Sequence, residues 1–304
     1  MINNNVFIAT MPRSGSTLLG MVLEQHPLIY HAGETFFWGR LDINTTRCSC
    51  GNMPCQTLSR VKGNIKFEEE LNILFKTCSM FSRPSDQKDV YANLSIQDFN
   101  EQYDQNEWSK LENYLNISCE VLGKMSNIFR EIVAKKIIID NTKVIQIGQR
   151  LLNCHDWKVI LLTRDVRGVA SSNKNLALRK NREIMLESRL PYYIQFARHA
   201  INLLKTRHKN LMWVKYEDVC HNPKKIFSDI CNFIGIEYSD EMLNFRKNKG
   251  HAIMGNRMRF EDNDKFTEDL SWESRLSLEE KQIICNNKEL VKLYKILGYN
   301  LGGM

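Results

Sequence analysis

The residues best suited to chemistry form one short loop near the start of the chain, Arg13-Ser14-Gly15-Ser16-Thr17. Its hydroxyl groups are donors, the Arg13 guanidinium fits anionic oxygens, and Gly15 lets the backbone approach a ligand closely. If the loop opens a helix, unpaired N–H groups add to a phosphate or sulfate site. The loop lacks the Gly-x-x-x-x-Gly-Lys-[Ser/Thr] pattern of the ATPase P-loop, which counts against an ATP-driven kinase.

A second candidate anion site follows the apolar run 158–163. Arg164 ends that run, and Ser172 lies eight residues later, on the helix that the next residues predict. An Arg at the carboxyl end of a parallel strand points into the crevice where α/β sheets bind ligands. Taken alone, Arg164 and Arg167 could be surface charges with Asp165 as a helix cap. Their order in the chain, after the first loop, favours a second phosphate site.

Both segments resemble those of sulfotransferases that use 3′-phosphoadenosine 5′-phosphosulfate (PAPS). The similarity is greatest to the tyrosylprotein and carbohydrate enzymes and their bacterial relatives. Segment 13–19, His26-Pro27 and Gly33-Glu34-Thr35 resemble the 5′-phosphosulfate loop and the strand after it. Segment 159–172 resembles the 3′-phosphate motif, which assigns Arg164 and Ser172 to that phosphate. Segment 216–218, Tyr-Glu-Asp, resembles a family segment to which we assign a structural role.

The resemblance also implies catalytic roles. Glu34 matches the base that takes the proton of the acceptor hydroxyl, with His31 as the rival base because phenol and steroid sulfotransferases use a His. Lys143, at the end of a predicted strand, would neutralise the bridging oxygen of the leaving group. Arg13 would hold the sulfate and the 5′-phosphate. The donor is then PAPS, the product is adenosine 3′,5′-bisphosphate (PAP), and the in-line displacement requires no metal.

The segment 251–260 contains Gly255-Asn256-Arg257-Met258-Arg259, and bacterial relatives carry a similar stretch. By this resemblance it closes over the nucleotide, with Arg257 or Arg259 near a phosphate. Other sulfotransferases use an Arg-Lys-Gly loop there, which this chain lacks.

Three cysteines, Cys48, Cys50 and Cys55, form a tight group. With a fourth ligand they could bind zinc, and a disulfide is also possible. The spacing contains no Cys-x-x-Cys pair and three ligands are incomplete. We therefore expect ordinary loop thiols and no metal.

Alternating strands and helices must position these residues. Short apolar runs predict strands at 6–10, 28–30, 137–140, 158–163 and 211–215, with helices between them. This pattern predicts a P-loop-like α/β fold: a mostly parallel sheet of about five strands with helices on both faces. We expect one domain over residues 1–304, with a helical insertion at about 40–135 that shapes the acceptor pocket.

Composition narrows the functional classes. The 304 residues carry a net charge of +7, which suits an anionic ligand, and no zinc-finger or RNP-type signature indicates nucleic acid. No apolar run is long enough to span a membrane, no signal peptide is recognisable, and the nine cysteines are an odd count, so we expect a cytoplasmic protein. The expected partner is a hydroxyl-bearing acceptor: a carbohydrate, a tyrosyl group or another metabolite. A small-molecule kinase and a non-catalytic nucleotide- or glycan-binding module of the same fold remain alternatives.

Overall fold

Five parallel strands form the central sheet of the computed structural model, which describes residues 5–82, 105–262 and 264–302. The strands lie in the order β2-β3-β1-β4-β5, and every neighbouring pair is parallel. Their bounds are β1 Asn5–Thr10, β2 Ile29–Gly33, β3 Ile137–Lys143, β4 Trp157–Thr163 and β5 Leu211–Lys215. The predicted α/β fold with a parallel sheet is therefore confirmed.

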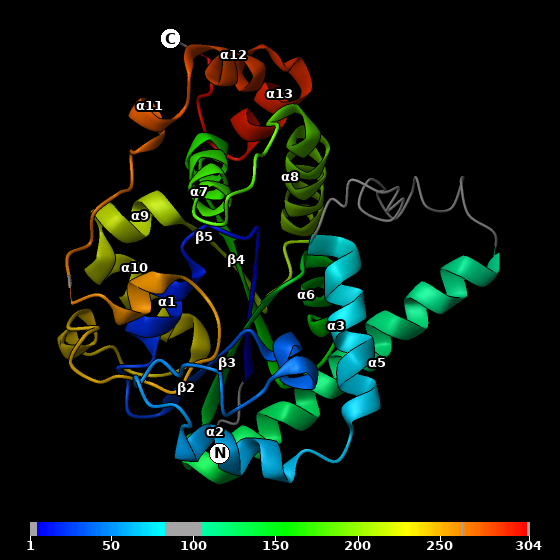
Figure 1. The fold of residues 1–304 in the computed structure, drawn as a ribbon, viewed down its shortest axis with the longest axis vertical. Helices are drawn as coiled ribbons and strands as arrows, with labels where there is room; N and C mark the ends of the chain where they lie inside the picture. Colours follow the sequence, from blue (N-terminus) through cyan, green and yellow to red (C-terminus); the bar gives the residue numbers. More distant parts are fainter. Residues whose placement is uncertain (1–4, 83–104, 263, 303–304) are drawn as a thin grey trace.

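Helices cover both faces of this sheet because its inner strands are apolar on both sides. On β4, Val159 and Leu161 pack into one buried cluster, and Ile160 and Leu162 pack into a second cluster on the opposite face. Helices α1, α9 and α10 lie on one side of the strands, and α3, α5 and α6 lie on the other (Figure 1). The sheet is thus enclosed between two layers of helices.

The helices before β3 are α1 Ser16–Leu23, η1 Thr35–Arg40, α2 Gln56–Asn64, α3 Glu68–Ser82 and α5 Gln105–Val133. Between β3 and the end of β5 lie α6 Ile145–Leu151, α7 Val166–Leu178, η3 Glu187–Arg189 and α8 Leu190–Lys205. The remaining helices are α9 Tyr216–His221, α10 Pro223–Ile234, η4 Asp240–Leu243, η5 Arg257–Phe260, α11 Trp272–Arg275, α12 Leu278–Asn286 and α13 Lys288–Ile296. Within the described residues, no helix is both long and apolar enough to cross a bilayer.

Two strands extend beyond the ends predicted from the sequence. Strand β2 continues to Gly33 instead of ending at residue 30, and β3 continues to Lys143 instead of residue 140. At the C-terminus, α12 and α13 are separate helices, because the Asn287 side chain accepts a hydrogen bond from the Leu290 amide (2.9 Å) and caps α13. Helices α2, α3 and α5 lie in the predicted helical insertion, of which residues 83–104 fall outside the described residues.

Candidate active site

A cleft of about 590 Å³ lies at the carboxyl end of the sheet, where ligands bind in open α/β folds. All five strands contribute to its walls: Arg13 after β1, Glu34 after β2, Lys143 at the end of β3, Arg164 after β4 and Tyr216 after β5. Residues separated by more than 200 positions in the chain therefore meet because parallel strands end at the same edge.

The loop before α1 has the backbone that an anion site requires. Arg13 and Gly15 both adopt positive φ angles, 76° and 93°, so the chain turns sharply into the helix N-terminus. A Cβ on Gly15 would lie 2.4 Å from Cδ2 of Tyr216, so the loop packs directly against that ring. The hydroxyl of Ser14 is fully buried, and none of the described residues forms a hydrogen bond with it.

Two guanidinium groups connect the loop to α7 and to the C-terminal segment. Arg13 Nε donates to Ser172 Oγ (2.9 Å), and Arg164 donates to the Arg13 carbonyl (3.0 Å). Arg164 also contacts a carboxylate oxygen of Asp269 (3.2 Å) and lies 4.4 Å above the ring of Tyr216. Burial, and next the charge of Arg164, lower the pKa of Arg13. An anion would relieve this repulsion between neighbouring cations.

The charged side chains that line the cleft favour an anionic ligand. The residues that line the cleft include more cations than carboxylates. The cations are Arg13, Lys143, Arg164, Lys180 and Lys265, and the carboxylates are Glu34, Glu261 and Asp269. Lys143 ends β3 and Arg164 follows β4, so these two cations lie on either side of β1 and the Arg13 that follows it. One elongated ligand with an anionic group at each end fits this distribution.

The catalytic candidates Glu34 and Lys143 form an ion pair, with the Lys143 ammonium against one oxygen of the Glu34 carboxylate. Their side chains are only 15% and 9% exposed, so water screens the pair weakly. Lys143 has a positive φ angle, and the Asp140 side chain holds the end of β3 by accepting a hydrogen bond from the Thr142 amide (2.7 Å). Burial raises the pKa of Asp140 to about 6.

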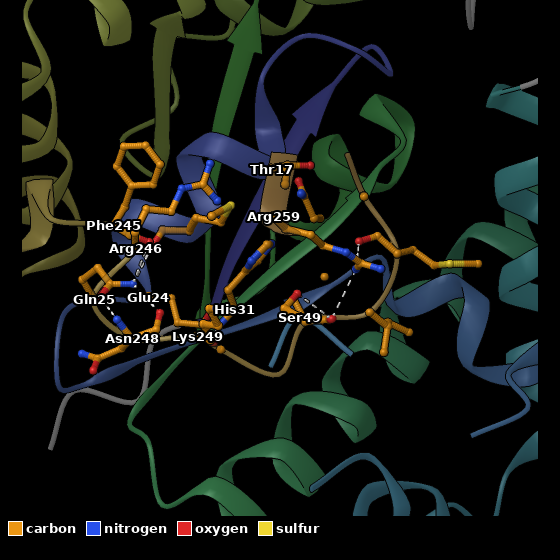
Figure 2. A pocket seen from close by; sticks show the side chains of 18 of the residues that line it. Thr17, Glu24, Gln25, His31, Ser49, Phe245, Arg246, Asn248, Lys249 and Arg259 are labelled. Carbon is orange, nitrogen blue, oxygen red and sulfur yellow. Dashed lines mark hydrogen bonds between the residues drawn. The ribbon is translucent and has the colours of Figure 1, made fainter. Parts of the chain in front are cut away.

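His31, the rival base, lies elsewhere. Figure 2 shows its ring beside a second, smaller cavity, between Glu24 and Arg259. The ring packs against Gly20, and His31 is not among the described residues that line the cleft at the carboxyl end of the sheet. Burial, followed by the charge of Lys143, lowers the pKa of His31 to about 3. Of the two candidate bases, only Glu34 lies in the cleft wall.

The segment 254–256 reaches the cleft, and the Asn256 amide donates to Thr17 Oγ1 (3.0 Å). Arg257 and Arg259 were predicted to lie near a phosphate. Neither is among the described residues that line the cleft. Arg257 is exposed, and the Arg259 guanidinium donates to backbone carbonyls, including those of residues 47 and 254.

Sequence reasoning missed several groups of the cleft. Tyr216 was assigned a structural role, although its position directly after a strand is the signal that also identified Arg164. Asp269 and Lys265 lie in an irregular segment between η5 and α11, where no periodicity predicts a position. Phe36 and Phe37 line the cleft from η1, a helix that the Gly33-Glu34-Thr35 motif did not predict.

Comparisons with known proteins agree with this geometry. The model of the Sulfotransferase family matches residues 5–240, more than three quarters of the chain. The chain belongs to the sulfotransferase family. This finding confirms the predicted resemblance to PAPS-dependent sulfotransferases.

Solved structures of sulfotransferases share the fold. The sulfotransferase domain from the curacin biosynthetic pathway has a TM-score of 0.57 and 18% identity, covering 98% of this chain and 99% of that domain. Sulfotransferase STF9 from Mycobacterium avium has a TM-score of 0.50 and 14% identity, covering 94% of this chain and 76% of that chain. No curated protein sequence is similar enough to this sulfotransferase to give a match.

Proposed function

We propose that this sulfotransferase moves the sulfuryl group of PAPS onto an acceptor hydroxyl, with Glu34 as the base and Lys143 and Arg13 as the electrostatic groups. The observation that carries the proposal is the Glu34–Lys143 ion pair, which lies in the same cleft as the anion loop. Strands β2 and β3 are neighbours, so a base and a cation end side by side at the sheet edge.

The two ends of the cleft would hold the two anionic ends of the donor. The N–H groups at the start of α1, with Arg13 and the unpartnered hydroxyl of Ser14, fit the 5′-phosphosulfate. Gly15, Ser16 and Thr17 complete this loop. Arg164 and Ser172 fit the 3′-phosphate, and Arg13 Nε already connects the two halves through Ser172.

Each charged group has a distinct part in the reaction. Glu34 accepts the hydroxyl proton as the acceptor oxygen bonds to sulfur and the sulfur–oxygen bond to the nucleotide phosphate breaks. Lys143 then faces the oxygen that carries the leaving negative charge. Arg13 stabilises the charge spread over the sulfuryl oxygens. Binding of the donor would separate Lys143 from Glu34 and free the carboxylate for the acceptor.

The acceptor side of the cleft is partly aromatic. Phe36 and Phe37 follow Glu34 closely, with ring centroids 4.1 Å apart, and both line the cleft. Phe75 of α3 packs on both rings, which gives the helical segment after residue 40 its proposed role in shaping the acceptor pocket. Such a wall suits an acceptor whose hydroxyl adjoins an apolar face, such as a sugar ring or a tyrosyl side chain.

The test is transfer of ³⁵S from labelled PAPS to a panel of tyrosyl peptides, oligosaccharides and phenols, followed by the Glu34→Gln variant with the best acceptor. Because a base contributes about 10²–10⁴-fold, kcat should fall in that range while the Kd for PAP changes little. Glu261→Gln is the matched control, since Glu261 also lines the cleft but is exposed at its rim. Equal losses in both variants would contradict the role of Glu34.

Ligand binding discriminates the alternatives. A kinase would bind ATP with magnesium more tightly than PAP, whereas the proposed enzyme prefers PAP in calorimetry. A non-catalytic module would bind PAP but transfer no label to any acceptor, and Glu34→Gln would then change nothing.

A further inference from the structure

Four potential metal ligands lie close together outside the cleft described above. The three clustered cysteines, Cys48, Cys50 and Cys55, lie with His251, and all their ligand atoms are within 4.8 Å of one another. His251 lies 196 residues beyond Cys55, so the sequence pattern alone gave an incomplete set of three ligands. Cys48 and Cys55 are fully buried, which shields the cluster from solvent.

The distances match a tetrahedral zinc ion. Zinc binds thiolate sulfur at about 2.3 Å and imidazole nitrogen at about 2.0 Å, so tetrahedral ligands lie about 3.8 Å apart for two sulfurs and about 3.5 Å for sulfur and nitrogen. The sulfurs of Cys50 and Cys55 are 3.8 Å apart. Nδ1 of His251 lies 3.7 Å from the sulfur of Cys48 and 3.3 Å from that of Cys55.

From this geometry we propose that Cys48, Cys50, Cys55 and His251 bind one structural zinc ion. Four protein ligands close the coordination shell, which is typical of a structural rather than a catalytic site. Binding releases the three thiol protons to solvent, and the imidazole binds through its neutral Nδ1. This proposal replaces the expectation of ordinary loop thiols without a metal.

The backbone is already shaped for such a site. The Gly51 amide donates to the Cys48 carbonyl (2.9 Å), and Gly51 has a φ angle of 91°, so the first two cysteines lie in one tight turn that ends at Gly51. Cys55 is the N-cap residue of α2, where N–H groups favour a thiolate. The carbonyl of His251 accepts a hydrogen bond from the hydroxyl of Tyr30 (3.3 Å), and this bond fixes the segment that carries the imidazole.

The zinc ion would tie the helical segment to the segment that reaches the cleft. Ser49, between two of the ligands, bonds twice to the Ala252 carbonyl, at 3.2 Å through its amide and 2.9 Å through its hydroxyl (Figure 2). Next in the chain, the Ile253 carbonyl accepts the amide of Glu34 (3.3 Å). The metal therefore stabilises the backbone that positions the proposed base.

The first experiment measures metal in the full-length protein, purified without chelator and without added zinc, by plasma mass spectrometry. We expect about one zinc ion per chain, as a closed Cys₃His site requires. Replacement by Co²⁺ should give thiolate charge-transfer bands in the near ultraviolet and the visible bands of tetrahedral cobalt. A wild-type protein without stoichiometric zinc, with a Cys50–Cys55 disulfide in intact-mass analysis, would overturn the proposal.

Variants assign the ligands. Cys50→Ser is the mildest, because Cys50 is only half-buried, and it should lower zinc content at least about fivefold after dialysis against a weak chelator. His251→Ala should do the same. Cys154→Ser is the matched control, since Cys154 is exposed and outside the cluster, and it should keep its zinc. Unchanged zinc in both ligand variants would show that the metal lies elsewhere and refute the site.

Discussion

Replacing Arg164 with Ala should remove the preference of this sulfotransferase for a nucleotide with a 3′-phosphate. The side chain is 6% exposed and held in place by the Tyr216 ring, the Asp269 carboxylate and the Arg13 carbonyl. A guanidinium so fixed pays little ordering entropy when it meets a phosphate. It should therefore discriminate strongly between PAP and adenosine 5′-monophosphate (AMP), which lacks that phosphate.

The magnitude follows from the hydrogen bonds at stake. Each bond to a charged group contributes about 1.5–3 kcal/mol, so even a partly formed fork on the 3′-phosphate is worth about 3 kcal/mol. That energy corresponds to roughly a 100-fold change in affinity. The ratio of the Kd for AMP to the Kd for PAP should fall by this factor in Arg164→Ala.

Calorimetry with both nucleotides measures the ratio directly, and the comparison separates recognition from structural damage. If Arg164 only holds the Arg13 loop, both nucleotides lose affinity equally and the ratio stays constant, which would refute the assignment. Arg167→Ala is the matched control, because Arg167 pairs with Asp165 and stacks on Trp272, away from the cleft. Its ratio should equal that of the wild type.

Three further variants test the catalytic cation, the loop and a buried acid. Lys143→Ala should lower single-turnover sulfuryl transfer about 100-fold with little change in PAP affinity, because the cation acts on the leaving charge; weaker PAP binding alone would contradict this role. Gly15→Ala, with its Cβ 2.4 Å from Tyr216 and a φ angle of 93°, should cost about 2–4 kcal/mol in urea unfolding, whereas Gly63→Ala, with open space, should not. Since burial raises the pKa of Asp140 from 3.8 to about 6, the folded state binds its proton more tightly, so stability falls as pH rises through this interval. Asp140→Asn should remove that loss, about 3 kcal/mol, and an unchanged pH profile would argue against the raised pKa.

The strand ends explain why much of the cleft could be predicted from sequence. Arg13, Glu34, Lys143 and Arg164 each follow an apolar run or end it, and a parallel sheet brings the carboxyl ends of its strands together. Local patterns therefore sufficed to gather residues that are distant in the chain. The strand order itself, with β3 between β2 and β1, was not predicted, because pairing depends on contacts between distant segments.

Groups outside the strand ends could not be predicted in this way. Asp269 reaches Arg164 from an irregular segment, and His251 reaches the cysteines from another. Their positions depend on how loops fold over the sheet edge, which neither periodicity nor spacing specifies. The expectation for Arg257 and Arg259 depended on resemblance in such a loop, and there the structure places backbone rather than guanidinium groups at the cleft.

The proposed zinc site and the proposed base depend on the same backbone segment, so loss of the metal should affect the 5′ side of the cleft and spare the 3′ side. Segment 251–256 carries a zinc ligand, contacts the Glu34 amide and bonds to Thr17. Arg164 is instead held by the Arg13 carbonyl, the Asp269 carboxylate and the Tyr216 ring, and none of these three groups forms a hydrogen bond to this segment among those described above. Chelation of zinc should therefore lower kcat. It should also weaken the binding of PAP and AMP by the same factor, because both nucleotides carry the 5′-phosphate, so the ratio of their Kd values stays constant. A ratio that falls with zinc would mean that the two ends of the cleft are not independently supported.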